Sequence, residues 1–264
     1  MTETRTSMAD LLSDIRGILV RERELFGEAL LTDPGLRGNV TMARPKPELP
    51  KRADEPALFE LPVPATLPIT GEAWGSAQTL DGLHERICAC VKCPLGRTRT
   101  NFVFGTGNPA ATLMIIGEAP GADEDAQGEP FVGKAGQLLN KILEAIGFKR
   151  GDVYICNILK CRPPGNRKPV AEEVDMCLPY LRKQIALVKP KLILALGLTA
   201  AENLLATTES LGRLRGRILE YEGTPLMVTY HPAALLRNPN WKRPAWEDVQ
   251  AVRKLHDELV AQGR

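Results

Sequence analysis

The sequence lacks an apolar run long enough to cross a bilayer, and it carries little net charge. Its 264 residues are 44% hydrophobic and 25% charged, with a formal net charge of +2 and a pI near 8.2. Asp10, Asp14 and Arg16 interrupt the apolar residues near the amino terminus, so the continuous core of a secretory signal is absent. We therefore expect a cytoplasmic protein with no membrane partner, and any acidic partner has to be argued from local charge.

Regular periodicity is also missing from residues 33–76, which contain eight prolines and few apolar residues. Such a composition predicts an extended linker rather than a packed unit. Before it, residues 7–27 place Met8, Leu11 and Ile15 on one helical stripe, which predicts an amphipathic helix. This helix is either a packing element or a docking peptide for a protein partner. The predicted parts are an N-terminal helix (1–32), a Pro-rich linker (33–76) and a folded domain (77–264).

The remainder of the chain alternates short apolar runs with amphipathic helical patterns. The predicted strands are 113–116, 153–155, 192–196 and 226–228. The predicted helices are 133–147, 171–188, 198–206 and 245–261. Strands that alternate with helices predict an α/β fold with a parallel, doubly wound sheet.

Polar residues follow the predicted strands at the edge where such sheets bind ligands. They are GEAPG at 117–121, Asn157, the segment 197–199, and His231 within Tyr-His-Pro. Glycine, carboxylate, amide and imidazole groups should therefore meet at one rim. The glycine-rich turn also exposes backbone N–H groups that can bind a base or a phosphate.

Six cysteines suggest a second site. Cys90 and Cys93 form a C-x2-C pair, and Cys161 and Cys177 lie further along the chain. Four thiolates in a cytosolic protein indicate a metal site; their spacing alone does not separate zinc from an iron–sulfur cluster, and zinc is the first expectation from the residues alone. Cys156 ends a predicted strand and is expected to be a buried thiol. Cys88 competes with Cys90 as a ligand but lacks the two-residue spacing to Cys93.

Several motifs in unbroken order resemble those of family 4 uracil-DNA glycosylases. They are GEAPG, the acids at 124 and 125, PFVGKAGQLL, YICNILKCRPPGNRKP, ILALG and HPAALLRNP, between residues 83 and 259. The resemblance implies a three-layer α/β/α fold with a short four-stranded parallel sheet. It also implies a monofunctional DNA repair hydrolase, a monomer that removes uracil from single- or double-stranded DNA. It favours a [4Fe-4S] cluster over zinc, on Cys90, Cys93, Cys161 and Cys177.

The rim residues have roles that suit such a reaction. Phe131 can stack on an extruded base, and the Asn157 amide can pair with N3–H and O4 of uracil. His231 can donate to O2 as the bond breaks, while Glu118 can activate water or stabilise a cationic sugar. Each also has an ordinary structural alternative: a core phenylalanine, a turn-holding amide, a structural histidine or a capping carboxylate. The expected catalytic residues are Glu118 and His231, and the expected substrate-binding residues are Gly117, Ala119, Gly121, Glu124, Phe131 and Asn157. The resemblance implies that Glu124 crowds C5 of the base and excludes thymine, although Glu124 and Asp125 could also form a solvated face.

DNA contacts are expected on both flanks of the rim. Leu235, Leu236 and Arg237 are predicted to form a wedge that fills the space left by the extruded base, unless the leucines are buried against the last helix. Basic residues that can contact phosphate are Lys160, Arg162, Arg167 and Lys168, together with Arg213, Arg215 and Arg217.

Two other functions compete with uracil excision. A DNA-binding relative without catalysis could associate with a polymerase or repair complex, but the intact Glu118, Asn157 and His231 argue against it. An electron-transfer iron–sulfur protein would not need these residues at strand ends. In the glycosylase, the cluster is expected to connect the segment before the sheet to the basic loop, as a structural staple.

Overall fold

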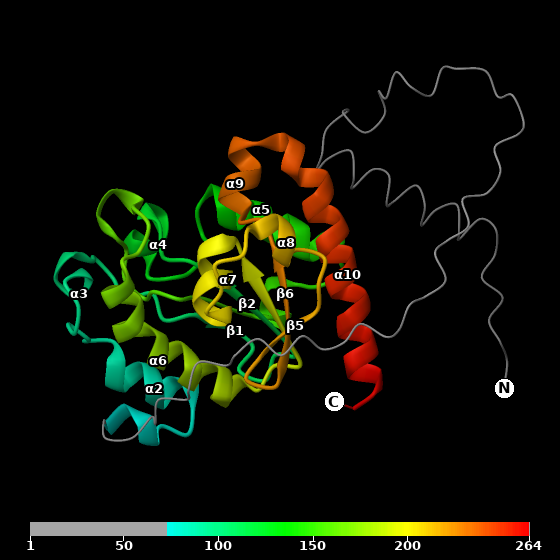
Figure 1. Cartoon of the computed structure of the whole chain (residues 1–264). Helices are drawn as coiled ribbons and strands as arrows, with labels where there is room; N and C mark the ends of the chain where they lie inside the picture. Colours follow the sequence, from blue (N-terminus) through cyan, green and yellow to red (C-terminus); the bar gives the residue numbers. More distant parts are fainter. Residues whose placement is uncertain (1–72, 264) are drawn as a thin grey trace, which may run out of the picture. The chain divides into compact units, whose positions relative to one another are not determined.

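The computed structural model describes residues 73–263, which form a mixed six-stranded sheet between two layers of helices (Figure 1). The strand order is β1-β3-β2-β4-β6-β5. The four central strands run parallel to one another, while β1 and β5 pair antiparallel at the two edges. The predicted α/β class and the four-stranded parallel core are therefore confirmed.

The elements have the following bounds. The strands are β1 (Thr106–Gly107), β2 (Leu113–Gly117), β3 (Tyr154–Asn157), β4 (Leu192–Leu196), β5 (Leu219–Tyr221) and β6 (Thr224–Thr229). The α-helices are α2 (Leu80–Ile87), α3 (Leu95–Thr98), α4 (Ala122–Gln127), α5 (Lys134–Ala145), α6 (Ala171–Val188), α7 (Leu198–Leu205), α8 (Leu211–Leu214), α9 (Pro232–Arg237) and α10 (Lys242–Ala261). The short 3-10 helices are η3 (Ala73–Ser76), η4 (Arg150–Asp152), η5 (Pro164–Asn166) and η6 (Pro239–Trp241).

The central strands are buried on both faces, which explains their continuous apolar runs. Alternate side chains contribute to two separate hydrophobic clusters. Met114 and Ile116 pack with residues of α2, α6 and α7, whereas Leu113 and Ile115 pack with residues of α5, α9 and α10. The period of two along each strand thus places one layer of helices on each face of the sheet.

Besides shifts of one to three residues at the ends of elements and several helices that were not predicted, two differences from the predictions stand out. The edge strands β1 and β5 were not predicted, because two- and three-residue strands carry too few side chains to show a period. Residues 73–76 were assigned to the linker but form η3, whose Trp74 is 9% exposed and packs edge-on against Tyr180. Residues 73–76 therefore pack with the folded domain instead of forming part of an extended linker.

The predicted N-terminal helix and the rest of the predicted linker lie outside the described residues. Among the helices of residues 73–263, none combines the length and the apolar composition that a membrane span requires.

Candidate functional site

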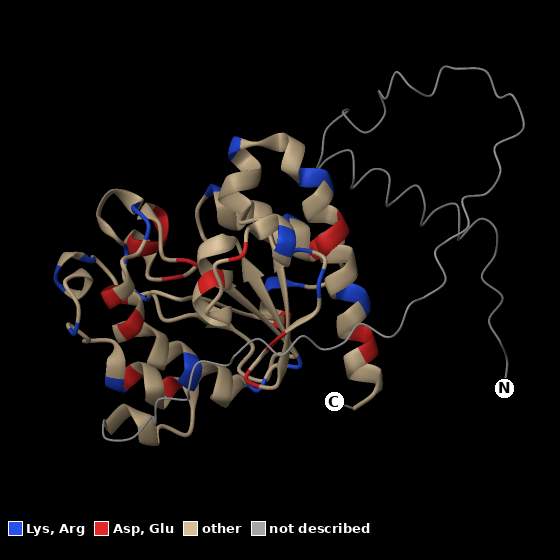
Figure 2. Ribbon diagram, in the orientation of Figure 1, with Lys and Arg blue, Asp and Glu red and all other residues tan. Residues whose placement is uncertain are grey.

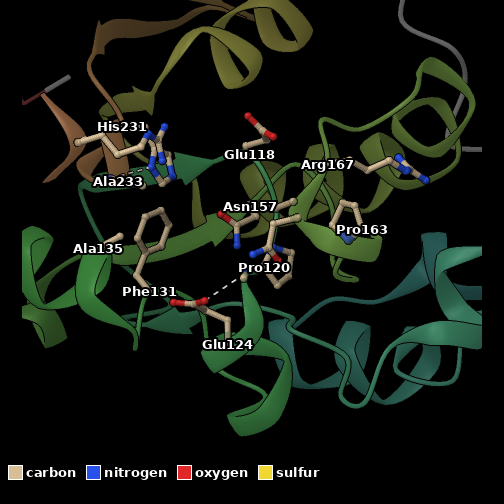
Figure 3. A pocket seen from close by; sticks show the side chains of 14 residues that line it. Glu118, Pro120, Glu124, Phe131, Ala135, Asn157, Pro163, Arg167, His231 and Ala233 are labelled. Carbon is tan, nitrogen blue, oxygen red and sulfur yellow. Dashed lines mark hydrogen bonds between the residues drawn. The ribbon is translucent and has the colours of Figure 1, made fainter. Parts of the chain in front are cut away.

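A cavity of about 320 Å³ opens where β2 and β3 end and α9 begins. This volume is at the small end of the range for ligand pockets, roughly 300–1,000 Å³. Its walls come from five separate segments of the chain, and Figure 3 shows most of their side chains. The lining residues are Glu118, Ala119, Pro120, Gly121, Glu124, Phe131, Ala135, Asn157, Pro163, Asn166, Arg167, His231, Ala233 and Arg237. The acid, aromatic, amide and imidazole side chains predicted to meet therefore share one cavity.

Gly117 makes the floor of this cavity possible. It pairs in register with Asn157 at the ends of β2 and β3. A Cβ atom on Gly117 would lie 2.4 Å from Asn157 Oδ1 and 2.6 Å from Phe131 Cζ, both closer than atoms can approach. The absence of a side chain thus lets the Phe131 ring and the Asn157 amide come together over the strand ends. Gly117 shapes the site by making room.

The turn that carries Phe131 is strained and held from both sides. Phe131 has a φ of 54°, in the left-handed region that side chains rarely adopt. The Arg150 guanidinium donates to the carbonyl oxygens of Pro130 and Phe131. On the other side, Glu124 Oε1 accepts the N–H groups of Val132 and Gly133, both at 3.0 Å. Two oppositely charged side chains thus hold the backbone on both sides of Phe131.

Glu124 and Asp125 do not form a solvated face. Besides its two contacts with the Phe131 turn, Glu124 accepts the N–H of Gly121 through Oε2 at 3.1 Å. Asp125 is buried and accepts the N–H groups of Thr100 and Asn101. Glu124 still lines the cavity, as Figure 3 shows, so its carboxylate both holds the turn and faces the ligand space.

The Asn157 amide presents an unpaired acceptor to the cavity. Its side chain is 2% exposed, and its Oδ1 has no hydrogen-bond partner among the described residues. A buried acceptor without a partner costs about 1–3 kcal/mol, so a ligand that donates to Oδ1 recovers that free energy. A Cβ atom on Gly117 would clash with both this atom and the edge of the Phe131 ring, so the two lie near each other. The cavity is therefore preorganised for a flat ligand with an N–H on its edge.

His231 is a neutral donor in this site. Burial is the main cause that lowers the pKa of His231 to about 4, and the nearby Arg237 cation lowers it further. Its Nδ1 accepts the N–H of Ala233 at 3.2 Å, which leaves the ring proton on Nε2. The imidazole stacks on Phe131 with ring centroids 5.5 Å apart and an interplanar angle of 30°. His231 can therefore donate a hydrogen bond from Nε2 without carrying a charge.

Glu118 supplies a carboxylate on the opposite wall from Phe131 in Figure 3. Its backbone carbonyl accepts the N–H of Leu159, which holds the segment after β2 alongside the segment after β3. Within residues 73–263, no hydrogen bond or ion pair occupies its half-buried side chain. The carboxylate is thus available to a water molecule or a sugar.

Two residues predicted to contact DNA are buried instead. Leu235 is 2% exposed and packs in the cluster beneath α9 and α10, so it cannot enter a duplex. Lys160 is 0% exposed, and its Nζ donates to the Asn157 carbonyl at 2.8 Å, so it cannot reach phosphate. Both predictions were wrong because exposure within a short polar or apolar run depends on what packs over it. Leu236, by contrast, is 48% exposed on α9.

The remaining predicted cations differ in how firmly they are held. Arg215 forms a buried two-point ion pair with Asp248 and stacks on Tyr230, so its predicted phosphate contact is corrected to a structural role. Arg167 pairs with Glu173 but lines the cavity, and Lys168 pairs with Glu202 on the surface. The other basic side chains are Arg162 bonded to Asn166, Arg217 paired with Glu209, and Arg213 and Arg237, which are exposed. Figure 2 shows basic and acidic segments interspersed rather than one uniform basic face.

The predicted cysteine ligands come from three segments at one side of the domain. Cys90 and Cys93 follow α2, Cys161 follows β3, and Cys177 lies in α6. Burial raises the pKa of the Cys161 thiol, and the neighbouring Cys93 and Cys90 thiols raise it further. Among residues 73–263, no three His, Cys, Asp or Glu side chains converge as ligands of a single metal ion. Cys156 is fully buried in β3, as predicted.

Two polar residues of the site escaped the sequence analysis. Asn166 lines the cavity with a φ of 55°, at the end of the turn that begins at Pro163. Arg150 reaches the Phe131 turn from 19 positions away. The Pro-Pro-Gly-Asn run could have indicated a rigid turn beside the rim, but nothing local distinguishes Arg150 from a surface cation.

The sequence is similar to those of known proteins. The family model described as "Uracil DNA glycosylase superfamily" matches residues 104–250. A type-4 uracil-DNA glycosylase of Pyrobaculum aerophilum is 51% identical over 170 residues, which cover 61% of this chain and 86% of the relative. Those of Archaeoglobus fulgidus and Sulfurisphaera tokodaii are each 41% identical over 186 residues, covering 67% of this chain and 94% and 84% of the relatives.

Proposed function

The chain belongs to the uracil-DNA glycosylase superfamily, and we propose that it removes uracil from DNA by hydrolysing the N-glycosidic bond. The single observation that carries this proposal is the unpaired Asn157 Oδ1 beside the Phe131 ring. An unpaired acceptor next to an aromatic plate complements the N3–H edge and the flat face of uracil. The similar type-4 relatives support the same activity.

Base recognition follows from the fixed position of the amide. A uracil turned out of the DNA stacks on Phe131, donates its N3–H to Asn157 Oδ1 and accepts at O4 from Asn157 Nδ2. Cytosine presents an acceptor at N3 and a donor at N4, which leaves both amide atoms unmatched. Because the Asn157 side chain is buried, water cannot compensate for that mismatch.

Bond cleavage uses His231 and Glu118, which lie on opposite walls of the cavity. As the C1′–N1 bond breaks, its electron pair leaves with uracil, and His231 Nε2–H stabilises the charge that develops on O2. Glu118 stabilises the cationic sugar and accepts a proton from the water whose oxygen bonds to C1′. The products are free uracil and an abasic site.

DNA contacts are proposed for the exposed residues around the cavity. Leu236 fills the space left by the extruded nucleotide, and Arg237 lies next to it at the end of α9. Arg162, Arg167 and Lys168 follow β3 on the other side of the opening, where each can contact phosphate. The substrate is uracil-containing DNA, single- or double-stranded.

The four predicted cysteine ligands fit a [4Fe-4S] cluster. Three of their sulfurs accept a hydrogen bond: Cys161 from Arg99 at 3.1 Å, Cys90 from Tyr180 at 3.2 Å and Cys177 from the Lys160 N–H at 3.3 Å. Donors aimed at sulfur are the surroundings that thiolate ligands need. Each thiolate of such a cluster binds a different iron, so the sulfurs need not converge on one point. When bound, the cluster supplies structural cross-linking and negative charge.

The proposal is tested with a uracil-containing oligonucleotide and a matched cytosine control. Wild-type protein should produce alkali-labile breaks at uracil alone, whereas binding without breaks would instead support a catalytically silent relative. Asn157→Asp should slow uracil excision about 10- to 100-fold, because a carboxylate cannot donate to O4. The ratio of cytosine to uracil excision should rise in this variant. Unchanged cytosine rejection would falsify the role assigned to Asn157.

A further inference from the structure

Trp241 is a large aromatic side chain at the protein surface. It is 40% exposed, although one face of its indole lies on the Tyr230 ring, with centroids 5.1 Å apart and an interplanar angle of 13°. The face turned away from Tyr230 is therefore open to solvent. Tryptophan is highly buried on average, and exposed indoles are enriched where proteins bind other molecules.

The Tyr230 ring beneath this indole is itself held in place. The Arg215 guanidinium lies over the Tyr230 ring, 4.4 Å from its centroid. Arg215 also donates to both carboxylate oxygens of Asp248, at 2.7 and 2.9 Å, and this carboxylate is 4% exposed. Because Arg215 joins the stacked pair to a buried carboxylate, the indole is preorganised. A ligand that stacks on Trp241 therefore loses little additional conformational entropy.

The backbone that carries Trp241 is also fixed. Pro239 begins η6, and Asn238 Oδ1 accepts the N–H of Asn240 at 3.2 Å. The Trp241 N–H donates to the Asn238 carbonyl oxygen at 3.2 Å. The indole is thus held on a short capped turn rather than on a long loop.

Trp241 lies next to the elements that form the opening of the cavity. Tyr230 directly precedes His231, which lines the cavity, and η6 packs against α9. Helix α9 carries the exposed Leu236 and ends at Arg237, which also lines the cavity. A ligand that enters the cavity and extends over α9 therefore continues toward η6.

Basic residues accompany the indole. Arg237 precedes Trp241 in the chain, and Lys242 and Arg243 follow it directly. The Arg243 side chain is 75% exposed and pairs with Glu247 at 3.6 Å, a surface contact that water screens. An aromatic ring among cations is the combination that binds single-stranded nucleic acid, because the ring stacks on a base while the cations attract phosphates. These charges favour a DNA strand over an apolar protein partner.

We propose that Trp241 stacks on an unpaired base of the uracil-bearing strand, close to the extruded uracil, and so holds single-stranded DNA over the cavity. This inference rests on the proposed function. Tyr230 and Arg215 position the indole, and Leu236 separates it from the extruded nucleotide. Because every base has a face that can stack, Trp241 binds the strand without selecting its sequence. In a duplex the neighbouring bases stay paired, so the contact strengthens binding to single strands more than to duplexes.

The test compares two variants with one control. Trp241→Ala removes the ring, Trp241→Phe keeps a smaller ring, and Val260→Ala alters an exposed apolar side chain at the far end of α10 (Figure 1). The first readout is the dissociation constant of a uracil-free single-stranded oligonucleotide. Trp241→Ala should weaken binding about tenfold, since one base stack is lost, and Trp241→Phe should weaken it less. Val260→Ala should match the wild type, and wild-type affinity in Trp241→Ala would overturn the proposal.

The affinity for free uracil separates stacking from a structural role. Free uracil has no neighbouring base, so its dissociation constant in Trp241→Ala should match the wild type. If Trp241→Ala weakened the binding of free uracil as much as that of DNA, the indole would only support Tyr230 and the adjacent His231. That outcome would overturn the proposal.

Tryptophan fluorescence gives a readout in a variant that keeps an aromatic ring. The chain has three tryptophans, and Trp241 is more exposed than Trp74, which is 9% exposed. A base stacked on Trp241 should quench the emission when single-stranded DNA is added. Trp241→Phe should still bind DNA but lose most of this quenching. Quenching equal to that of the wild type would contradict the stack.

Abasic nucleotides locate the stacked base. Strands with a non-cleavable uracil analogue carry one abasic nucleotide at successive positions on either side of it. At one position the abasic nucleotide should weaken wild-type binding and have no further effect in Trp241→Ala, because both changes remove the same contact. Additive losses at every position would exclude it.

These measurements separate the inference from the proposed function. If the wild type fails to excise uracil but its affinity for uracil-free single strands depends on Trp241, the stacking site stands and the glycosylase activity does not. If the wild type excises uracil and Trp241→Ala binds DNA as tightly as the wild type, the opposite holds.

Discussion

At the residue scale, His231 shows how burial decides a chemical role. An imidazole in water has a pKa near 6.5, which would leave it partly charged at neutral pH. In this cavity burial lowers the pKa to about 4, so the ring is neutral and its single proton is on Nε2. A neutral donor stabilises negative charge on a departing base without first attracting the anionic phosphates of the substrate.

Titration of His231 by NMR tests this state. We expect a pKa close to 4 in the wild type and a higher value in Arg237→Gln, because Arg237 is the cation that lowers it. Between about pH 4 and the unfolded value near 6.5 the unfolded chain binds more protons, so His231 contributes stability that is complete above 6.5 and lost as the pH falls through 4. A wild-type midpoint near 6.5 would contradict the assignment.

At the scale of elements, the segment between α4 and α5 carries Phe131. Side chains from outside this segment hold its backbone turn in place. Gly136 of α5 packs so closely on this turn that a Cβ atom there would lie 1.9 Å from the Phe131 carbonyl oxygen. Arg150 of η4 donates to the backbone carbonyl oxygens of Pro130 and Phe131, where Phe131 has a left-handed backbone conformation. The strain at Phe131 is therefore offset by interactions with neighbouring elements.

Arg150→Met should loosen the turn that positions the Phe131 ring. Base stacking on an aromatic ring is worth roughly 1–3 kcal/mol, so partial loss should raise the KM for uracil-containing DNA about five- to tenfold. Arg150→Lys keeps one donor and should fall between wild type and Arg150→Met. The neighbouring Lys149→Met, at an exposed side chain, should leave KM unchanged. Equal KM values for wild type and Arg150→Met would show that Arg150 does not position the Phe131 ring.

At the scale of the whole molecule, the proposed cluster connects the segment before the sheet to both the loop after β3 and helix α6. Arg99 reinforces this connection, because it donates to the carbonyls of Cys88 and Cys90 as well as to Cys161 Sγ. Gly96 allows the loop to close, since a Cβ atom there would lie 2.7 Å from the Cys90 carbonyl oxygen. Removal of the metal should therefore affect folding before it affects chemistry.

Cys161→Ala should lose soluble folded protein, because a structural metal site can contribute roughly 10 kcal/mol or more to folding. Circular dichroism and iron content measured on the same preparation would show this. Cys88→Ala is the matched control: Cys88 Sγ contacts only the Glu85 carbonyl among the interactions of the described chain, so iron should be retained. A soluble, iron-free and fully active Cys161→Ala protein would contradict this structural role of the cluster.

The sequence by itself determined the central sheet, its helices and the positions of the rim residues. These depend on local periodicity and on the rule that parallel strands end at a common edge, so residues 192–196 and 171–188 were predicted with the bounds that the structure has. Asn157 and His231 could be placed at one cavity for the same reason, whereas Phe131 was placed there by the family resemblance and its neighbouring glycines.

Only the tertiary structure decided which side chains remain accessible and which hold others in place. Leu235 and Leu236 are adjacent and chemically identical, yet one packs in the core and the other faces solvent. Lys160 looks like its basic neighbours in sequence, but the packing of distant segments buries it beneath Asn157. Burial, and therefore charge and contact, depends on segments that meet only after folding, which no local pattern records.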